Sequence, residues 1–507
     1  MQAFQPDCSL PPPGTNYVSG PNTRSTLSIL WNCLSIIFLC TWTIQHLNVP
    51  AIRPEVKGFW RKLWQHILDS KIKAKWMIMT ILIPEYLVGR ALGEWLAARD
   101  MTATTKWSMV EAYMANMGHF VLDVGETDGS PATAKEQNET PLDDSNTEQR
   151  AAPEVKLADS GPEVLVPLPP TAPTAPSFSA SDAASAESES FRINLRRLKG
   201  RFWALNAAQW VTAVDQDIAD SPGAGVHSSQ LEKLDKSGAL VKTLALIQVT
   251  YLVVQLIARK IIRLPSSQLE IAALAFAASS ALTYALYWSR PQGVETFRFI
   301  KAKPRDRRRR FNFHEPELIT RGVNASLETD RYQLAKRGPV YLWLGHRGND
   351  VPKPDLGPIP IPNDAGHLVY DIGGFGSLLG HNDEAAVLAF GSVLGGALFG
   401  GLHCLAWNFE FPTGAEQVIW RVCAILTTTL PVVAVVPLTV WIQLNPHDSS
   451  AKHGRARTVV GIFILFGLIV PYVLARLVIM VEIFRTLCYL PPEAYKETWS
   501  GSFPRWG

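Results

Sequence analysis

The sequence lacks the local motifs that assign a reaction. It contains no Gly-x-Ser-x-Gly hydrolase elbow, no HExxH zinc motif, no Walker phosphate loop and no Asp-rich prenyl-diphosphate motif. The stretch Gly373-Gly374-Phe375-Gly376 has no suitable strand before it and no suitable helix after it, so it does not indicate a nucleotide loop. We therefore expect no cofactor, and the question of enzymatic activity stays open.

Cysteine and charge are also scarce. The six cysteines are Cys8, Cys33, Cys40, Cys404, Cys423 and Cys488. Their positions form no regular spacing, and four lie in apolar segments, so we predict neither a disulfide scaffold nor a metal site. Charged residues make up 18% of the chain, and the formal net charge is +3. The first apolar run follows a lead without a basic region, which favours a retained anchor over a cleaved signal peptide.

Long apolar runs are what the sequence does contain. Six have about the twenty residues that a helix needs to cross a bilayer: 26–44, 240–262, 269–288, 384–407, 422–442 and 458–484. A seventh, 76–98, is interrupted by Pro84, Glu85, Arg90 and Glu94, so we favour a tilted, re-entrant or interfacial helix there. The predicted fold class is all-α, a polytopic helical membrane bundle of six spans, with seven as the alternative.

The remaining sequence divides by composition. The segments are 1–25, a polar N-terminal tail; 26–122, the first span with interfacial or re-entrant helices; 123–190, a disordered insert; 191–239, a basic amphipathic segment; 240–289, a two-span hairpin; 290–383, an Arg-rich and then Pro/Gly-rich loop; 384–485, three C-terminal spans; and 486–507, a C-terminal tail. The insert is rich in Ala, Pro, Ser and acidic residues, and it cannot bury enough apolar surface to fold.

Basic residues predict the orientation. They gather in the connection 45–75, in the run Arg307 to Arg310, and in the loop with Lys452, Arg455 and Arg457. With six spans, all three connections fall on the cytoplasmic side and both chain ends lie outside. Between spans, the arginine run indicates cytoplasmic retention, so we expect no nucleic acid as partner.

Two stretches have the pattern of a helix at a membrane surface. In 59–68, aromatic and aliphatic residues repeat at helical spacing with charges between them. This pattern suits a helix on the inner membrane surface, or equally an amphipathic helix packed on protein. In 191–210, five basic residues alternate with apolar ones, which favours a basic helix on anionic lipid.

Glycines mark the span 384–407. Gly391 and Gly395, and then Gly396 and Gly400, are four residues apart, so they leave a groove that another helix can approach closely. A homo-oligomer through the face of Gly391, Gly395 and Gly400 is one outcome that this spacing predicts.

Titratable residues in apolar segments are the candidate site residues. His403 lies one turn after Gly400, and with Glu410 it could supply acid–base catalysis on a lipophilic substrate. The alternative is that His403 bonds a neighbouring helix. The intramembrane polar candidates are Glu85, Arg90, Gln248, Gln255, Arg476 and Glu482. They could line a site or a polar path, or they could serve as ion pairs, snorkelling side chains and interhelical hydrogen bonds.

Four stretches resemble a family of fungal integral membrane proteins of unknown biochemical function. They are DCSLPPPGTNYVSGPNTRSTLSILWNCLSIIFLCTWTIQHLNVP, KWMIMTILIPEYLVGRALGEWLAARD, QVTYLVVQLIARKIIRLPSSQLEIAALAFAASSALTYALYWSRP and FGGLHCLAWNFEFPTGAEQVIWR. The resemblance implies membrane embedding and a filamentous-fungal source, and it implies no reaction.

Three functions follow as hypotheses. The first is a membrane scaffold or binding accessory in fungal lipid or specialised (secondary) metabolism. The second is a membrane-embedded enzyme that uses His403 as acid or base. The third is a small-solute transporter or channel. In each case we expect a multi-pass protein of the plasma membrane or an endomembrane, with the lipid bilayer and a lipophilic small molecule as partners.

Overall fold

The computed structural model describes residues 24–52, 58–125, 189–222, 239–303, 322–341, 357–367, 384–434, 437 and 463–496. These residues all belong to one compact unit, made of 1–125 and 188–507. Most of the predicted insert, the arginine run, the glycine stretch near Gly374 and the loop with Lys452 lie outside the described residues.

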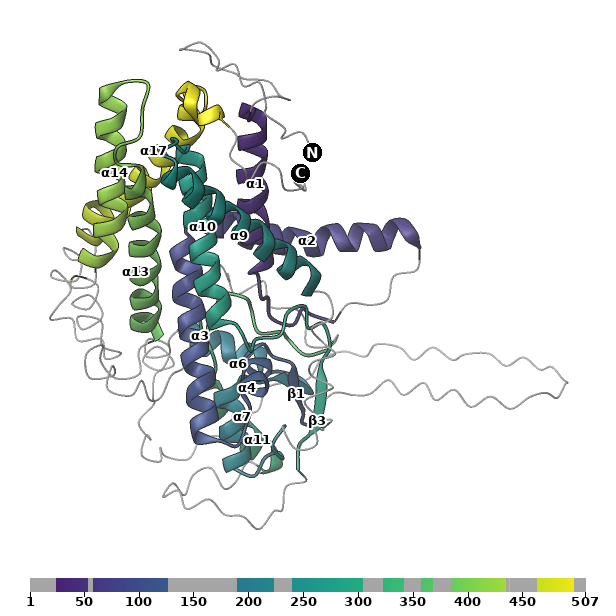
Figure 1. Cartoon of the computed structure of the whole chain (residues 1–507). Helices are drawn as coiled ribbons and strands as arrows, with labels where there is room; N and C mark the ends of the chain where they lie inside the picture. The colour runs from purple at the N-terminus through teal and green to yellow at the C-terminus, as the bar shows by residue number, and fades with distance from the viewer. Residues whose placement is uncertain are drawn as a thin grey trace, which may run out of the picture. The chain divides into compact units, whose positions relative to one another are not determined.

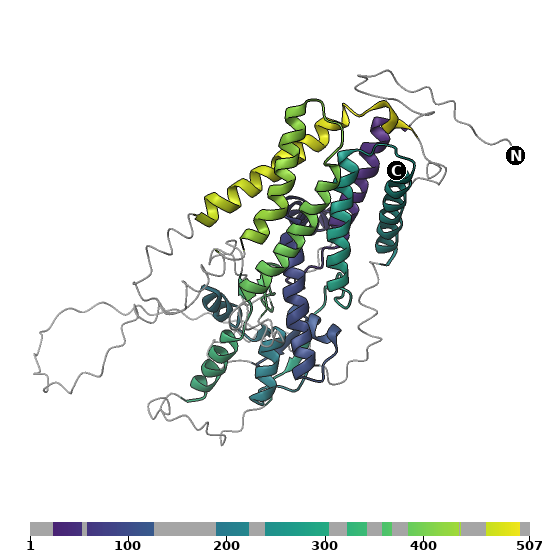
Figure 2. The ribbon, with the colours of Figure 1, turned by 60° about the vertical axis from the view of Figure 1, so that its left-hand side comes forward.

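Five of the described helices are long and apolar enough to cross a membrane. Their apolar stretches are Thr26–Thr43, Gln268–Leu286, Val387–Ala406, Gly414–Val433 and Phe466–Leu487. They belong to α1 (Thr26–Thr43), α10 (Gln268–Leu286), α13 (Glu384–His403), α14 (Gly414–Val433) and α17 (Val470–Leu487, preceded by a π-helix). Figures 1 and 2 show α13, α14 and α17 side by side. The prediction of helices with the length and apolar character of membrane spans is thus confirmed for five segments.

The count of six or seven spans stays a prediction. The segment 240–262 is the helix α9 (Ala239–Ile261), which is not among the five. The segment 76–98 divides between α2 (Phe59–Leu82) and α3 (Pro84–Thr104). The break lies at Ile83, because Pro84 has no backbone N–H to continue α2, yet its fixed φ suits the first turn of α3. In Figure 1, α2 runs crosswise to α1 and α3.

Contacts between chain segments show which helix ends lie together. The backbone N–H of Arg24, just before α1, donates to the carbonyl of Tyr495, just after α17, at 3.0 Å. The Arg24 guanidinium also contacts the carboxylate of Glu270 in the first turn of α10. Ser267 and Glu270 form the capping box that starts α10. The start of α1, the residues just after α17 and the start of α10 therefore share one end of the bundle.

A small mixed core lies at the other end of α10. In it, β1 (Phe120–Asp123) pairs antiparallel with β2 (Phe202–Ala204) and parallel with β3 (Arg298–Lys301). Around the sheet lie α4 (Met109–Asn116), α6 (Glu189–Arg197), α7 (Ala207–Asp215) and α11 (Gly322–Lys336), and a second pair joins β4 (Val340–Tyr341) to β5 (Ala365–Gly366). The structure is thus mostly helical with a few short strands, where the predicted fold class is all-α.

The single helix predicted for 191–210 is wrong. The helix α6 ends at Arg197, Gly200 turns the chain with a φ of 76°, and Phe202–Ala204 enters the sheet. Arg197 is 1% exposed and donates to the carbonyl of Ala204 at 2.8 Å, so it satisfies buried backbone groups. Trp210, fully buried, packs in the same core. The basic pattern arises here from one buried structural arginine and several surface ones.

The glycines of α13 are in close contact with helices of the same chain. A Cβ on Gly391 would lie 2.6 Å from the Cα of Gly89 in α3, and one on Gly400 would lie 2.6 Å from the backbone nitrogen of Thr428 in α14. A Cβ on Gly395 would lie 2.9 Å from the Cβ of Val88 in α3. The predicted close approach of a helix occurs within the monomer, and the homo-oligomer stays a prediction.

Candidate functional site

Buried polar side chains converge where α1 and α10 end against the middle of α3. We call this group the boundary cluster and define it as Asn48, Arg90, Glu94, Tyr287, Arg290 and His367.

Each member is placed by the end or the turn of an element. Arg90 and Glu94 are one helical turn apart in α3, so their side chains share a face. Arg290 lies in the turn that follows α10, and its backbone N–H donates to the carbonyl of Tyr287 at 2.9 Å. Asn48 follows α1, and His367 follows β5. The site therefore forms only when four distant parts of the sequence meet.

One carboxylate contacts both arginines of the cluster. The Arg90 Nε donates to Glu94 Oε1 at 2.8 Å, and the Arg290 Nη1 contacts Glu94 Oε2. The side chains of Arg90, Glu94 and Arg290 are 4%, 3% and 2% exposed. The Arg290 Nη2 also donates to Asn48 Oδ1 at 2.8 Å, and the Asn48 amide donates to the carbonyl of Pro362 at 2.9 Å.

The cluster carries more positive than negative charge. Two guanidinium groups share one carboxylate, which leaves one positive charge in a region closed to water. Within the described part of the chain, Arg90 Nη2, Arg290 Nε and His367 Nδ1 are buried without a hydrogen-bond partner. Burying a charge or a donor without a partner is costly. The arrangement therefore favours an additional anion.

One aromatic ring lies against each of the two guanidinium groups. The Arg290 guanidinium lies 4.8 Å from the ring centre of Tyr287, and that of Arg90 lies 5.0 Å from Trp76 in α2. Trp76 in turn stacks on Tyr86 with ring centres 6.4 Å apart. The negative faces of the rings attract the cations and offset part of their desolvation, but they do not neutralise the charge.

Burial also sets the protonation states. Loss of solvent, with repulsion from Arg290, Arg90 and Arg197, lowers the pKa of His367 to about 3, so its imidazole is neutral at pH 7. Burial, and then the charge of Arg90, lower the pKa of Arg290 well below its ordinary value. An anion beside Arg290 would favour its charged form. Because planar guanidinium groups bind carboxylate and phosphate oxygens well, these are the groups that the cluster fits.

His403, the sequence-predicted acid or base, is buried in α13. Its Nδ1 lies 2.7 Å from the Phe399 carbonyl, and its ring packs on Phe399 and Trp420 with centres 4.7 and 5.9 Å apart. Glu410 is exposed, and its carbonyl accepts from Gln268 at 2.9 Å. None of the contacts among the described residues joins His403 to Glu410, and the catalytic role of this pair stays a prediction.

The intramembrane candidates fall into different places. Glu85 accepts from Tyr472 Oη at 2.6 Å, whereas Arg90 belongs to the boundary cluster. Arg476 donates to the Leu82 carbonyl at 3.3 Å and lies 4.0 Å from the ring centre of Phe399.

The other three candidates lie apart from these contacts. Glu482 is buried in α17, and the described contacts do not pair it with Arg476. In α9, Gln255 is buried and Gln248 is half-buried. The sequence therefore located one residue of the boundary cluster as a candidate, Arg90, and noted Glu94 only as an interruption.

Sequence reasoning missed Asn48, Tyr287, Arg290 and His367. Arg290 follows a span by four residues, a place where an arginine is usually a solvated flank. His367 ends a Pro-rich segment without a helical period, where the sequence indicates turns and short strands and marks no site. The available signal was polar residues just beyond two span ends, which composition alone does not separate from ordinary loop residues.

Comparison with known proteins gives one family. A family of unknown function (DUF8562) matches residues 2–103 and 222–306, less than half of the chain. The matched stretches include Asn48, Arg90, Glu94 and Arg290, and they leave out His367. No curated protein and no solved structure matches the chain. The chain is thus similar to a family whose function is itself unknown.

Proposed function

We propose that this chain is a multi-pass membrane protein that binds an amphipathic molecule through its acidic head group. The observation that carries the proposal is that Arg90 and Arg290, both buried, share Glu94. Among the described residues, Glu94 is the one carboxylate in contact with either guanidinium group. A second anion, from a phosphate or carboxylate, would complete the charge balance.

The position of the cluster supports an amphipathic ligand. Asn48 and Arg290 each follow an apolar helix long enough to cross a membrane, α1 and α10. Tyr113, from the mixed core, donates its hydroxyl to the carbonyl of Leu286, the last residue of α10, at 2.9 Å. A ligand with its head at the cluster could therefore lay its apolar part along the helices. This agrees with the role of a binding accessory in fungal lipid or specialised metabolism.

Ligand binding by the purified protein tests the proposal. The probes are a phosphatidic acid, a fatty acid and a neutral diacylglycerol of the same chain length, added in a neutral detergent and followed by native mass spectrometry. We expect the two acids to bind and the diacylglycerol to bind at least about tenfold more weakly, because a charge-assisted hydrogen bond contributes roughly 1.5–3 kcal/mol.

Two variants make the test specific. Arg290→Gln should weaken binding of both acids, whereas Arg201→Gln, which removes a 49% exposed guanidinium paired with Asp123, should leave it unchanged. Equal binding of acidic and neutral probes, or full binding by folded Arg290→Gln, would overturn the proposal. A metabolite comparison between a deletion strain and its parent tests the pathway context.

A carrier is a second candidate, supported by a different observation. Glu85 Oε2 and Arg476 Nη1 are buried without a hydrogen-bond partner within the described part of the chain, next to the break between α2 and α3. Broken helices with unpaired polar groups occur at transport sites. Solute flux in proteoliposomes that Glu85→Gln abolishes would support a carrier.

The enzyme hypothesis requires instead that His403→Ala abolishes product while the protein stays folded.

A further inference from the structure

The N-terminal half of α2 presents large apolar side chains that no other described residue covers. Phe59, Trp60 and Trp64 are 73%, 77% and 59% exposed, and Leu63 is exposed beside them. Phe59 and Trp60 contact each other edge to face, with ring centres 5.5 Å apart. At helical spacing these four residues fall on one side of α2. A contiguous apolar face of this kind marks an interaction surface.

Two contacts fix α2 at the end of a membrane-crossing helix. Lys73 Nζ lies 4.7 Å from the ring centre of Trp42, the penultimate residue of α1. The Gln45 amide, just after α1, donates to Thr80 Oγ1 at 2.8 Å. Figure 1 shows α2 running crosswise at the level where α1 ends. A helix that lies across a span at its end lies along the surface of the membrane.

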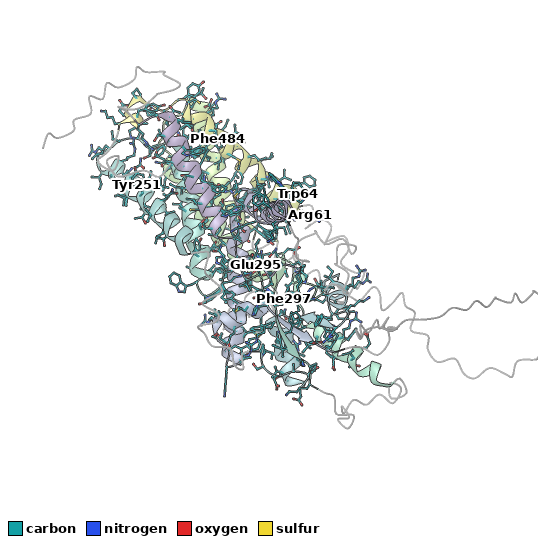
Figure 3. The ribbon with its side chains drawn as sticks, turned by 90° about the vertical axis from the view of Figure 1, so that its right-hand side faces the viewer. Arg61, Trp64, Tyr251, Glu295, Phe297 and Phe484 are labelled. Atoms are coloured by element: carbon teal, nitrogen blue, oxygen red, sulfur yellow. The ribbon has the colours of Figure 1, made fainter. Side chains whose placement is uncertain are left out.

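The charged residues of α2 are almost all positive. Arg61, Lys62, Lys71 and Lys75 are exposed, and Asp69 is the one acidic residue in the sequence of the helix. Arg61 and Lys62 fall on the side of the helix away from the aromatic face. In Figure 3, Arg61 and Trp64 project from the same end of α2. Lys71 reaches back to Trp64, with its Nζ 5.7 Å from the ring centre.

We infer that α2 is a membrane-surface helix that binds the head groups of an anionic lipid leaflet. Its aromatic residues Phe59, Trp60 and Trp64 enter the boundary between head groups and acyl chains, where aromatic rings are favoured. Its lysines and Arg61 contact lipid phosphates, an interaction that strengthens with the negative charge of the leaflet. The partner is the lipid surface, and the inference does not depend on the ligand of the boundary cluster.

Spin labels on the full chain in nanodiscs test the inference. A variant whose native cysteines are replaced carries a single cysteine at position 60, 61 or 64. Trp31→Cys serves as the reference for a lipid-facing site in α1, and Lys301→Cys as the reference for water. The collision rates of each label with oxygen and with a water-soluble nickel chelate are measured in phosphatidylcholine, with and without phosphatidylglycerol.

The labels at positions 60 and 64 should give oxygen-to-nickel collision ratios between the ratio at position 31, the lipid reference, and the ratio at position 301, the water reference. The label at position 61 should give a ratio close to that at position 301. Phosphatidylglycerol should raise the ratio at 60. The joint variant Arg61→Gln/Lys62→Gln should lose that response, because each surface charge alters partitioning by about fivefold. Lys260→Gln, an exposed lysine of α9, is the matched control and should keep it.

Three results would overturn the inference. The first is a ratio at 60 and 64 equal to that at 301, which places the face in water. The second is an oxygen-to-nickel ratio at position 60 that is the same in both lipid compositions and is unchanged in Arg61→Gln/Lys62→Gln. The third is a ratio at positions 60 and 64 that falls to the value at position 301 when each nanodisc holds a single copy of the protein. That result would mean that a second copy of this chain, and not lipid, covers the face.

Discussion

Arg90 and Arg290 contact opposite oxygens of the same carboxylate, that of Glu94, although 200 residues of sequence separate the two arginines. The carboxylate therefore joins α3 to the turn that follows α10. Removing one partner of a buried ion pair costs more than the pair itself contributes, because the charge left behind has no compensation. This asymmetry makes Glu94 the most sensitive position of the boundary cluster.

Glu94→Gln should lower the free energy of unfolding by about 3–5 kcal/mol, because two buried guanidinium groups would face no carboxylate. Thermal unfolding in detergent, followed by fluorescence, measures the change. Glu328→Gln is the matched control, since Glu328 is 68% exposed and pairs with Arg331 at the surface. Its effect should stay below about 1 kcal/mol. Equal effects of the two variants would contradict the shared role of Glu94.

Gly391→Ala should weaken the packing of α13 on α3. The added methyl would lie 2.6 Å from the Cα of Gly89, so one backbone must move. Overpacking of this kind costs about 1–3 kcal/mol. Gly401→Ala, where a Cβ meets nothing within 4 Å, should be neutral or slightly stabilising because alanine favours a helix. The melting temperatures of the two variants test this, and an undiminished Gly391→Ala protein would show that α3 can move away.

His367 should make stability fall with pH below neutrality. Its pKa is about 3 in the folded protein and close to 6.5 when unfolded. Above pH 6.5 the imidazole is neutral in both states. As pH falls from 6.5 towards 3, the unfolded chain binds a proton that the folded protein does not, so stability is lost by up to about 1.4 kcal/mol per pH unit.

His367→Gln removes this contribution, so its unfolding free energy should depend less steeply on pH than that of the parent. Denaturant unfolding at pH 8, 6 and 4.5 measures both slopes. His119, whose pKa is also lowered by burial, is present in both proteins, so the difference between them isolates His367. Parallel curves would mean that the imidazole of His367 is not buried in the folded protein.

Arg259→Lys should loosen the C-terminal segment. The Arg259 guanidinium, fully buried at the end of α9, donates to the carbonyls of Ala494 and Lys496 at 2.9 Å each and also contacts that of Pro265. Lysine carries its donors on a single nitrogen, so it cannot reproduce the planar fork whose separate nitrogens reach these carbonyls. Limited proteolysis should cut near residue 496 at least several-fold faster, while the exposed neighbour variant Lys260→Gln is cut at the parent rate. Unchanged cleavage would show that other contacts hold the segment.

The apolar helices could be predicted because their signal is local. About twenty apolar residues suffice to identify α1, α10 and α13. The predicted span 422–442 begins later than α14, which starts at Gly414. Thr413 caps that helix, and its early turns include Glu416 and Arg421, which an apolar window excludes. These charged residues have partners: Glu416 pairs with Arg485 at 2.7 Å, and the Arg421 Nε donates to the Trp407 carbonyl at 2.9 Å.

The sheet and the boundary cluster could not be predicted because both depend on distant contacts. Each strand of the three-stranded sheet has three or four residues, too few for a clear alternation. Asn48, Arg290 and His367 lie beyond the ends of their elements, where periodicity carries no information. The sequence therefore showed which segments are apolar, and the structure was needed to show which polar residues meet.

The pairing of β1 with β3 has a consequence for synthesis. Phe120 in β1 aligns with Arg298 in β3, and both α9 and α10 lie between them along the chain. During translation, β1 and β2 emerge from the ribosome first but have no third strand. The sheet can close only after α10 and then β3 have been made. Until then the edge of β1 that pairs with β3 is exposed, and a pause in translation before β3 would prolong the time during which the nascent chain is prone to aggregate.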